Sequence, residues 1–383
     1  MKRWTILLLV LAMTAAACGG TDPADTTASA GGVGSDTTMA EATGIDACAP
    51  GETDGDLNFY NWAEYIDPDL ITAFETESGI SVEYTEYESN EQMLAQVEAG
   101  AAPYDLVVPS DYMVDTMLAE GLLVKLNKSA LSNLGNLDPA FVNLPFDPTS
   151  DYSVPYQWGT TGIGINTATL GDVDPSWDLI FNPAVADQYE GRISMLDDPL
   201  EAMVAALHYL GYTLEEVIAD NNLDAIAEAE AVLTEANARV AKYDSVNFGD
   251  DLVNGEVDIA HGWSGGFFFS FAEVDNPDDY AYIIPKEGGV RWVDNPAIPV
   301  TVEHPCSALA MIDFLLDAEN GAQLTNWNYY GSPNQASEEF ILPEILDDPA
   351  IYPTGDALEN LEFIPQTGEL GLELQDAFLR SKG

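Results

Sequence analysis

Residues 57–65 begin as an apolar run and end with two aromatic rings, Trp62 and Tyr65, that flank the carboxylate of Glu64. Asp67, followed by proline, has the features of a helix N-cap. We therefore expect Trp62, Glu64 and Tyr65 in a loop between the C-terminal end of a strand and a helix, where open α/β sheets bind ligands. Ring faces and carboxylates both attract cations. The loop could bind a cation, or its rings could be ordinary half-buried packing residues.

Other predicted element ends carry similar residues. Asp198 and Glu201 share one face of the first turn of a helix expected over 199–210. Helix N-termini favour acidic side chains, so simple capping also explains this pair. Trp292 and Asp294 lie two apart on a predicted strand and therefore face the same way. The other candidates are Ser110, Tyr112, Trp263 and Tyr330.

Carboxylates at intervals, separated by aromatic rings, suit an elongated polycation. Each ammonium group needs a carboxylate partner, because an unpaired buried charge is costly. The methylene spacers would pack on ring faces, and each cation–π contact adds ~0.5–2 kcal/mol. Two alternatives stay open: aromatic platforms also bind sugars, and the oxygens of Asp197, Asp198 and Glu201 could bind a hard metal cation.

The sequence does not favour an enzyme. It has no nucleophile motif, and His208, His261 and His304 lack metal-ligand spacing. His208 falls within the helix expected over 199–210. His261 lies near the end of a predicted strand and could border a ligand-binding cleft formed by the candidate residues. A glycosidase-like pair of carboxylates is conceivable. We expect no catalysis, no cofactor and no bound metal.

The composition limits the partners. With 383 residues, the chain can form two domains with sizeable cores. It has 66 acidic and 11 basic residues, a net charge of −55. Such a field attracts cations and disfavours nucleic acids and anionic substrates, although an acidic surface also serves solubility or life at high salt.

The N-terminus has the features of a secretory signal. Two basic residues precede the apolar run Ile6–Met13, which is too short to span a membrane. The run Ala-Ala-Ala-Cys that ends at Cys18 resembles a bacterial lipobox, with Ala15 where leucine is preferred. The resemblance implies cleavage before Cys18 and lipidation of its thiol; a plain secreted protein is the alternative. We expect a signal peptide at 1–17 and a lipid-anchored flexible tether at 18–50.

Two cysteines remain, Cys48 and Cys306. An oxidising compartment favours a disulfide between them. Two unpaired thiols are the alternative, because sequence does not give their separation in space.

Strand and helix signals alternate after residue 57. A capping box from Ser89 to Gln92 begins one of the helices. The alternation predicts a parallel α/β layer, and a strand at 159–166 without a helix before it predicts a crossover to a second α/β lobe. Strands are expected at 57–60, 80–87, 104–108, 159–166, 192–196 and 257–263, and helices at 68–77, 89–100, 111–121, 199–210, 223–240, 306–316, 323–329 and 372–379.

Seven short motifs occur between residues 60 and 299. They are Tyr-Asn-Trp-Ala-Glu-Tyr (60–65), Tyr-Glu-Ser-Asn-Glu (87–91), Tyr-Asp-Leu-Val-Val-Pro-Ser (104–110), Pro-Phe-Asp-Pro (145–148), Val-Pro-Tyr-Gln-Trp-Gly-Thr-Thr-Gly-Ile-Gly (154–164), Pro-Lys-Glu-Gly-Gly (285–289) and Trp-Val-Asp-Asn-Pro-Ala-Ile-Pro (292–299). In these motifs and their order, over about residues 55–383, the chain resembles the spermidine/putrescine-binding family, the substrate-binding subunits of polyamine ABC importers.

The resemblance implies an α/β, two-lobed type II periplasmic-binding-protein fold, with two mixed sheets flanked by helices and a ligand cleft between the lobes. Lobe 1 would comprise 51–156 and 293–335, and lobe 2 would comprise 157–292 and 336–383. The implied protein is a monomer, lipid-anchored at the periplasmic or extracellular face of the cytoplasmic membrane. It would bind spermidine or putrescine and deliver it to permease and ATPase subunits.

The resemblance also implies roles for individual residues. The aromatic box of the family falls on Trp62, Tyr112, Trp263, Trp292 and Tyr330, with Tyr65 beside it, its amine-binding carboxylates on Asp198, Glu201 and Asp294, and further polar contacts on Glu64 and Ser110.

Two positions depart from the pattern of the family. Gly265-Gly266 lies after Trp263 where putrescine-preferring members carry an aspartate, which favours a spermidine-type site. The C-terminal glutamine of the family has no clean counterpart, and Gln366 is the candidate if the alignment shifts.

Overall fold

The computed structural model describes residues 44–100 and 102–383, which belong to one compact unit spanning Met39–Gly383. The expected signal peptide, the lipidation site Cys18 and most of the expected tether lie outside the described residues. Within the two described ranges, no helix has the length and apolar character needed to cross a bilayer.

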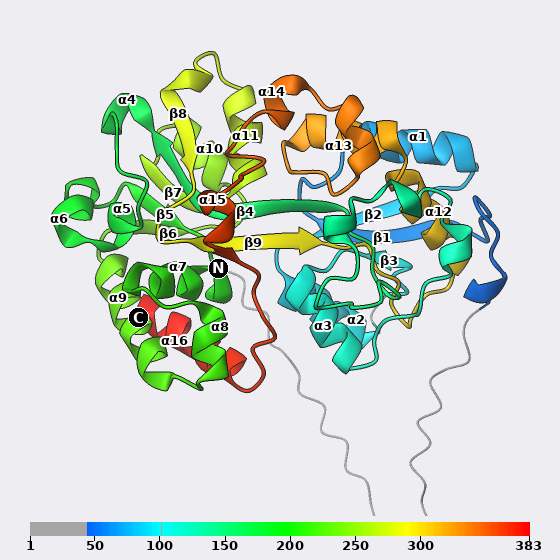
Figure 1. Cartoon of the computed structure of the whole chain (residues 1–383), viewed down its shortest axis with the longest axis horizontal. Helices are drawn as coiled ribbons and strands as arrows, with labels where there is room; N and C mark the ends of the chain where they lie inside the picture. Colours follow the sequence, from blue (N-terminus) through cyan, green and yellow to red (C-terminus); the bar gives the residue numbers. More distant parts are fainter. Residues whose placement is uncertain (1–43, 101) are drawn as a thin grey trace, which may run out of the picture. The chain divides into compact units, whose positions relative to one another are not determined.

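The first sheet contains three parallel strands in the order β2-β1-β3. A helix follows each strand, so the predicted parallel α/β layer is confirmed for this part of the chain (Figure 1). The elements are β1 (Leu57–Trp62), α1 (Pro68–Ser78), β2 (Val82–Tyr87), α2 (Asn90–Ala99), β3 (Leu106–Val107) and α3 (Asp111–Ala119).

Local capping explains where these helices begin. The side chain of Asp67 accepts a hydrogen bond from the backbone N–H of Asp69, and α1 follows. Ser89 accepts from the N–H of Gln92 at 3.2 Å, as the capping box predicts. The second bond of a capping box would join the Gln92 side chain to the N–H of Ser89. Here the Gln92 side chain accepts instead from the N–H of Glu88, at 3.1 Å.

The second sheet is larger and mixed. Its strand order is β10-β9-β4-β7-β5-β6, and β8 also pairs with β4. Strand β4 is antiparallel to β7, β8 and β9, whereas β5 is parallel to β6 and β7. The strands are β4 (Gln157–Asn166), β5 (Ile193–Met195), β6 (Val240–Tyr243), β7 (Ile259–Trp263), β8 (Tyr280–Ile283), β9 (Gly289–Asp294) and β10 (Leu361–Glu362).

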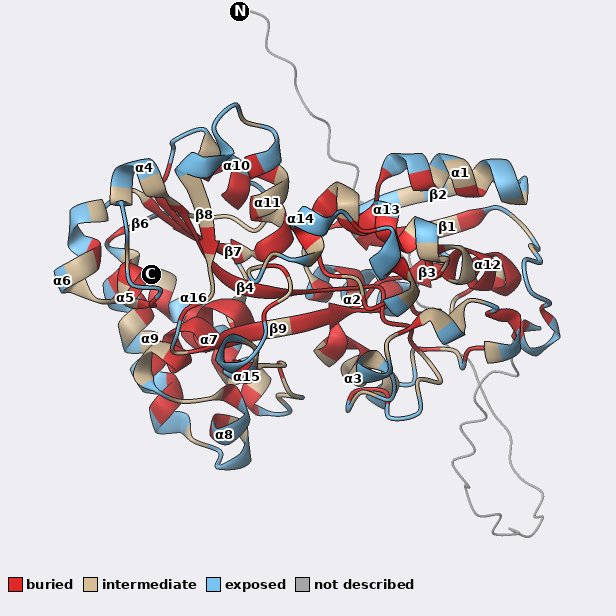
Figure 2. Cartoon of the chain, turned by 45° about the horizontal axis from the view of Figure 1, so that its top comes forward, coloured by how far each residue is buried: buried red, intermediate tan, exposed pale blue. Residues whose placement is uncertain are grey.

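Strands β4 and β9 are antiparallel and extend between the two sheets, with β9 leading toward the first sheet and β4 leading away from it (Figure 1). Asp294, the last residue of β9, forms an antiparallel bridge with Ser110, and Ala297 forms another with Val107 of β3. These bridges add antiparallel contacts to the first sheet. Both strands are buried along nearly their whole length (Figure 2). The two sheets are therefore joined through a buried strand pair next to the C-terminal ends of β1 and β3.

Helices cover the second sheet. Helix α16 (Leu370–Lys382) packs on α9 (Leu223–Asn237) and α7 (Pro199–Leu210). The predicted helix at 199–210 coincides with α7, whereas the one predicted at 323–329 falls in α13 (Ala318–Asn328) except for Tyr329, which is the left-handed C-cap. The longer helices are α7 (Pro199–Leu210), α9 (Leu223–Asn237), α11 (Ser264–Ala272), α12 (Pro305–Leu315), α13 (Ala318–Asn328) and α16 (Leu370–Lys382). The shorter helices are α4 (Thr167–Leu170), α5 (Asp178–Phe181), α6 (Pro183–Ala186), α8 (Leu214–Ala219), α10 (Phe248–Val253), α14 (Pro343–Leu346) and α15 (Asp356–Glu359).

The end of the expected tether is part of the folded structure. Cys48 is joined to Cys306 of α12 by a disulfide, with the two Cα atoms 5.3 Å apart. Ile45 is buried, and the side-chain amide of Asn127 donates to the carbonyl oxygens of Ile45 and Cys48. The expected flexible segment 18–50 is therefore wrong at its C-terminal end, because an apolar side chain and a disulfide hold 44–50 on the fold.

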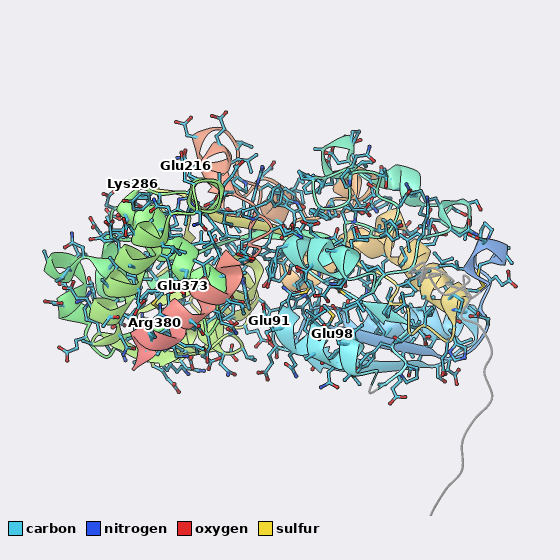
Figure 3. All side chains as sticks on the ribbon, turned by 90° about the horizontal axis from the view of Figure 1, so that it is seen from below. Glu91, Glu98, Glu216, Lys286, Glu373 and Arg380 are labelled. Carbon is cyan, nitrogen blue, oxygen red and sulfur yellow. A yellow bond between two sulfur atoms is a disulfide. The ribbon has the colours of Figure 1, made fainter. Side chains whose placement is uncertain are left out.

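The surface carries many carboxylates and few bases. Figure 3 shows Glu373 and Arg380 on α16, where Arg380 also pairs with Glu230. Exposed pairs of this kind contribute only ~0–1 kcal/mol each. With 66 acidic residues and 11 basic ones, ion pairs leave most of the negative charge uncompensated.

Candidate functional site

One cavity brings together ten of the eleven predicted binding residues, all except Glu64. It has about 600 Å³ of empty volume, part of it open to solvent. The residues that line it are Trp62, Ala63, Tyr65, Asn90, Ser110, Asp111, Tyr112, Asp198, Glu201, Trp263, Trp292, Asp294, Tyr330 and Ile364.

The loop after β1 forms one wall of this cavity. Trp62 is the last residue of β1, and its Nε1 donates to the carbonyl oxygen of Val108 at 2.9 Å. The Trp62 ring centroid lies 6.2 Å from that of Trp263, which ends β7 of the second sheet. The two sheets thus contribute indole rings that meet edge to face, with an interplanar angle of 65°.

Asp294 lies deep in the cavity, 5% exposed. Its Oδ1 accepts a hydrogen bond from Ser110 Oγ at 2.6 Å, and its Oδ2 accepts one from Tyr65 Oη at 2.7 Å. Burial raises the pKa of Asp294 to about 7, against the effect of these two donors. No basic side chain lies within 4.0 Å of this carboxylate in the described ranges.

Asp198 and Glu201 form the second acidic group. Asp198 caps α7, and its Oδ1 accepts from the N–H groups of Leu200 and Glu201 at 3.0 and 3.1 Å. Asp198 thus caps α7 and also lines the cavity. Burial raises the pKa of both side chains, and Asp198 raises that of Glu201 further.

One oxygen of Glu201 is held and the other is free. Oε1 accepts from Thr161 Oγ1 at 3.0 Å and from Trp263 Nε1 at 3.2 Å. Oε2 is buried without a hydrogen-bond partner among the described residues. A buried carboxylate oxygen of this kind is costly unless a donor reaches it. A ligand N–H group would supply that donor.

Aromatic residues from both sheets enclose these carboxylates. The ring of Tyr330 lies 5.2 Å from those of both Tyr65 and Trp292, between centroids. Tyr112 Oη accepts from Asn90 Nδ2 at 2.9 Å and donates to Glu91 on α2 at 3.3 Å. The cavity therefore offers carboxylates for ammonium groups and ring faces for methylene groups.

The glycines after Trp263 have a steric role. A Cβ atom at Gly265 would lie 2.5 Å from the Tyr330 ring, and one at Gly266 would lie 2.6 Å from the Phe248 ring. The hydroxyl oxygen of Tyr330 accepts from the N–H of Gly266 at 3.1 Å. An aspartate at Gly265 would displace the Tyr330 ring of this cavity, and one at Gly266 would displace Phe248, which lines an adjoining cavity.

The structure places Glu64 outside this cavity. Glu64 has a φ of 52°, in the left-handed region that non-glycine residues rarely adopt, and lines an adjoining cavity with Asp250. The two cavities share the side chains of Trp62, Tyr65, Trp263 and others. Burial raises the pKa of Glu64, and the charge of Asp250 raises it further. Glu64 therefore borders the site without reaching its centre.

Four residues that were not predicted from the sequence also line the cavity: Ala63, Asn90, Asp111 and Ile364. Gln366, the candidate for the C-terminal glutamine, lines a different neighbouring cavity, whereas Ile364 lines both cavities. Asn90 and Asp111 did carry a signal, because they adjoin the predicted Ser89 cap and the predicted site residue Ser110.

The histidines do not contribute to the cavity. His261 is fully buried in β7, with its ring 5.4 Å from Trp177, and burial lowers its pKa to about 3. The hypothesis that it borders the cleft is wrong. His208 Nε2 lies 2.9 Å from Glu362 Oε1, and His304 Nδ1 lies 3.4 Å from Asp105 Oδ2. Each histidine thus packs or pairs within the fold.

The hard-cation alternative lacks a ligand set. Asp197 pairs with Lys382 and does not line the cavity, whereas Asp198 and Glu201 do. In the described part of the chain, no three or more His, Cys, Asp or Glu side chains are arranged to hold a metal ion. These side chains therefore do not form the shared metal site that their sequence spacing allowed.

Comparison with known proteins gives consistent matches. The model of the family "Bacterial extracellular solute-binding protein" matches residues 69–354. The chain is 38% identical to the spermidine/putrescine-binding periplasmic protein of Escherichia coli K12 over 338 residues, 85% of this chain and 91% of that protein. It is 35% identical to the putrescine-binding periplasmic protein SpuD of Pseudomonas aeruginosa, over 85% of this chain and 90% of that protein.

Among solved structures, the chain is similar to the spermidine/putrescine ABC transporter substrate-binding protein PotD of Streptococcus pneumoniae. The TM-score is 0.72 at 31% identity, and the match covers 86% of this chain and 99% of that one.

Proposed function

The chain belongs to the family of bacterial extracellular solute-binding proteins, and we propose that it captures a linear polyamine, spermidine or putrescine, and delivers it to an ABC importer. One observation carries the proposal: Asp111, Asp198, Glu201 and Asp294 line one ring-walled cavity that no described Lys, Arg or His side chain lines. Buried carboxylates without basic partners favour a cationic ligand. The Escherichia coli and Pseudomonas aeruginosa relatives are named as spermidine/putrescine-binding and putrescine-binding proteins, which agrees with this ligand class.

The arrangement explains how such a ligand would be held. One terminal ammonium donates to Asp198 and to the free Oε2 of Glu201. Another ammonium donates to Asp294, whose geometry Ser110 and Tyr65 fix. The methylene groups between them lie on the faces of the aromatic walls, where cation–π contacts at each end add ~0.5–2 kcal/mol.

Two lobes supply the site, and their closure would enclose the ligand. Lobe 1 comprises 51–156 and 293–335, and lobe 2 comprises 157–292 and 336–383. Lobe 1 contributes Tyr65 and Asp294, and lobe 2 contributes Glu201 and Trp263. The edge-to-face contact of Trp62 with Trp263 and the mixed origin of the carboxylates support this division.

The protein acts by binding and delivery, without chemical conversion of the ligand. The relatives carry the names of binding proteins, and the carboxylates of the cavity are explained by ion pairing alone. Lipidation of Cys18 and a tether would hold a monomer at the outer face of the cytoplasmic membrane. Permease and ATPase subunits are the expected partners.

A thermal-shift panel tests the function. Spermidine and putrescine at submillimolar concentration should raise the Tm, while maltotriose and Ca²⁺ should leave it unchanged. Glu201→Gln keeps the size of the side chain and removes the charge, so it should reduce the shift. A rise with the sugar and none with any polyamine, for folded protein, would replace the proposed ligand by a carbohydrate.

A further inference from the structure

Asp111, the first residue of α3, is a buried carboxylate that lines the cavity. It is 2% exposed. Its Oδ1 accepts from the N–H of Tyr112 at 2.7 Å, and its Oδ2 accepts from the N–H of Val293 at 3.2 Å. Val293 lies between Trp292 and Asp294 on β9, so Asp111 is fixed directly against the strand that carries two other site residues.

Asp111 has no ion-pair partner within 4.0 Å in the described ranges. Burial raises the pKa of Asp111, whereas the charge of Arg291 lowers it. The Arg291 guanidinium itself is stacked on Phe363, with its Cζ 4.3 Å from the ring centroid. Among the described residues, two backbone N–H groups are therefore the only hydrogen-bond donors to this carboxylate. A buried carboxylate in this state is costly, and a cation that reaches it would offset the cost.

Asp111 interacts electrostatically with Asp294 and with Glu201. The charge of Asp294 raises the pKa of Asp111, and the charge of Asp111 raises that of Glu201. Asp111 accepts from the N–H of Val293, which adjoins Asp294 at the end of β9, and it lines the same cavity as Glu201 in the first turn of α7. Asp111 is therefore placed beside one acidic group and shares the cavity with the other. A ligand charge located between those two groups would interact with Asp111.

We propose that Asp111 is a fourth carboxylate of the site and a specificity-determining residue, which favours polyamines with an internal ammonium group over diamines of the same length. This inference rests on the proposed function and deepens it. A diamine places charge only at its two ends, near Asp294 and near Asp198 and Glu201. A triamine such as spermidine adds a charge between its ends.

The matched ligands are spermidine and 1,8-diaminooctane, which have the same chain length between terminal nitrogens and differ at the internal nitrogen. Asp111→Asn removes the charge and retains an acceptor oxygen. We expect it to weaken spermidine binding by about tenfold and 1,8-diaminooctane binding by less than about threefold. Asp220→Asn, at an exposed position outside the cavity, is the control and should change neither.

The ratio of the two Kd values is the readout, because a purely structural role would weaken both ligands alike. Asp111→Ser, measured in the same way, serves if the asparagine variant does not fold. A ratio that stays at the wild-type value in a folded variant overturns the inference. Wild-type protein that binds neither amine overturns the proposed function instead, so the two failures are distinguishable.

Discussion

The hydroxyl group of Tyr65 donates a hydrogen bond to Oδ2 of Asp294 at 2.7 Å, across 229 positions of the sequence. Both side chains are 5% exposed. Burial and the nearby Asp294 charge raise the pKa of Tyr65 well above its ordinary value, so the hydroxyl keeps its proton. This bond joins the loop after β1 to the end of β9. It explains why a short aromatic stretch near the N-terminus and a distant aspartate belong to one site.

Asp294→Asn should weaken spermidine binding by ~2–5 kcal/mol, because it removes one member of a buried charge pair in the complex. The amide still offers an oxygen to Ser110 or Tyr65, so the fold should persist. Isothermal titration calorimetry measures the loss, with Asp220→Asn as the exposed control. Equal affinities of the two variants would refute the role of Asp294.

Binding should release protons near neutral pH. Burial raises the pKa of Asp294 to about 7 and that of Asp111 to about 8, above the ordinary value of ~4. A polycation favours the ionised forms, so affinity should rise between about pH 6 and pH 8.5. Calorimetry in two buffers of different ionisation enthalpy counts the protons. Proton uptake, or an affinity that falls over this range, would contradict the assignment.

The same groups should reduce the stability of the ligand-free protein as the pH rises. Between about pH 4 and pH 8 they hold protons in the folded chain and lose them in the unfolded chain, so their contribution to the free energy of unfolding falls with pH. Replacing the carboxyl groups of both Asp111 and Asp294 by amides should flatten this dependence in urea titrations. A double variant with the wild-type slope would show that these two groups do not titrate in this window.

Trp263→Phe should weaken spermidine binding by about three- to tenfold, since phenylalanine keeps a ring but offers a weaker π face and no N–H donor. The lost donor is the Nε1 that holds Glu201 Oε1 at 3.2 Å. Trp327→Phe is the control, because Trp327 packs on Phe269 and does not line the cavity. Equal Kd values for the two variants would count against a role for Trp263.

Removal of the disulfide should lower stability without changing affinity. Cys48→Ser with Cys306→Ser opens a link across 258 positions, and loss of a native disulfide typically costs about 2–5 kcal/mol. Neither cysteine lines the cavity, so the Kd for spermidine should stay within about twofold at a temperature where the variant is folded. Urea titration and calorimetry measure the two quantities; unchanged unfolding free energy would contradict the structural role.

Local signals made the first part of the fold predictable. The caps at Asp67 and Ser89 mark helix starts that the structure contains. Strand β6 and the two-residue strand β10 gave no comparable signal, because they are short and depend on pairing with distant strands. The N-terminal limit of the fold was misplaced, since the burial of Ile45 depends on contacts with distant residues such as Asn127.

The site residues that could be predicted are aromatic or acidic residues at the end of a strand or helix, such as Trp62, Asp198 and Asp294. The site was not predictable where backbone geometry decides. The left-handed turn at Glu64 places that side chain in the adjoining cavity. Asp111 is fixed by Val293, 182 positions away, so its burial cannot be read from its neighbours in sequence.

A crystal structure of the complex with spermidine tests the central claim most directly. We predict one spermidine molecule in the cavity, with one terminal nitrogen within hydrogen-bond distance of Glu201 Oε2 and another nitrogen within the same reach of Asp294. The methylene groups should lie between the rings of Trp62, Trp263 and Trp292. Spermidine bound outside this cavity, or inside it without contact to either carboxylate, would contradict the account.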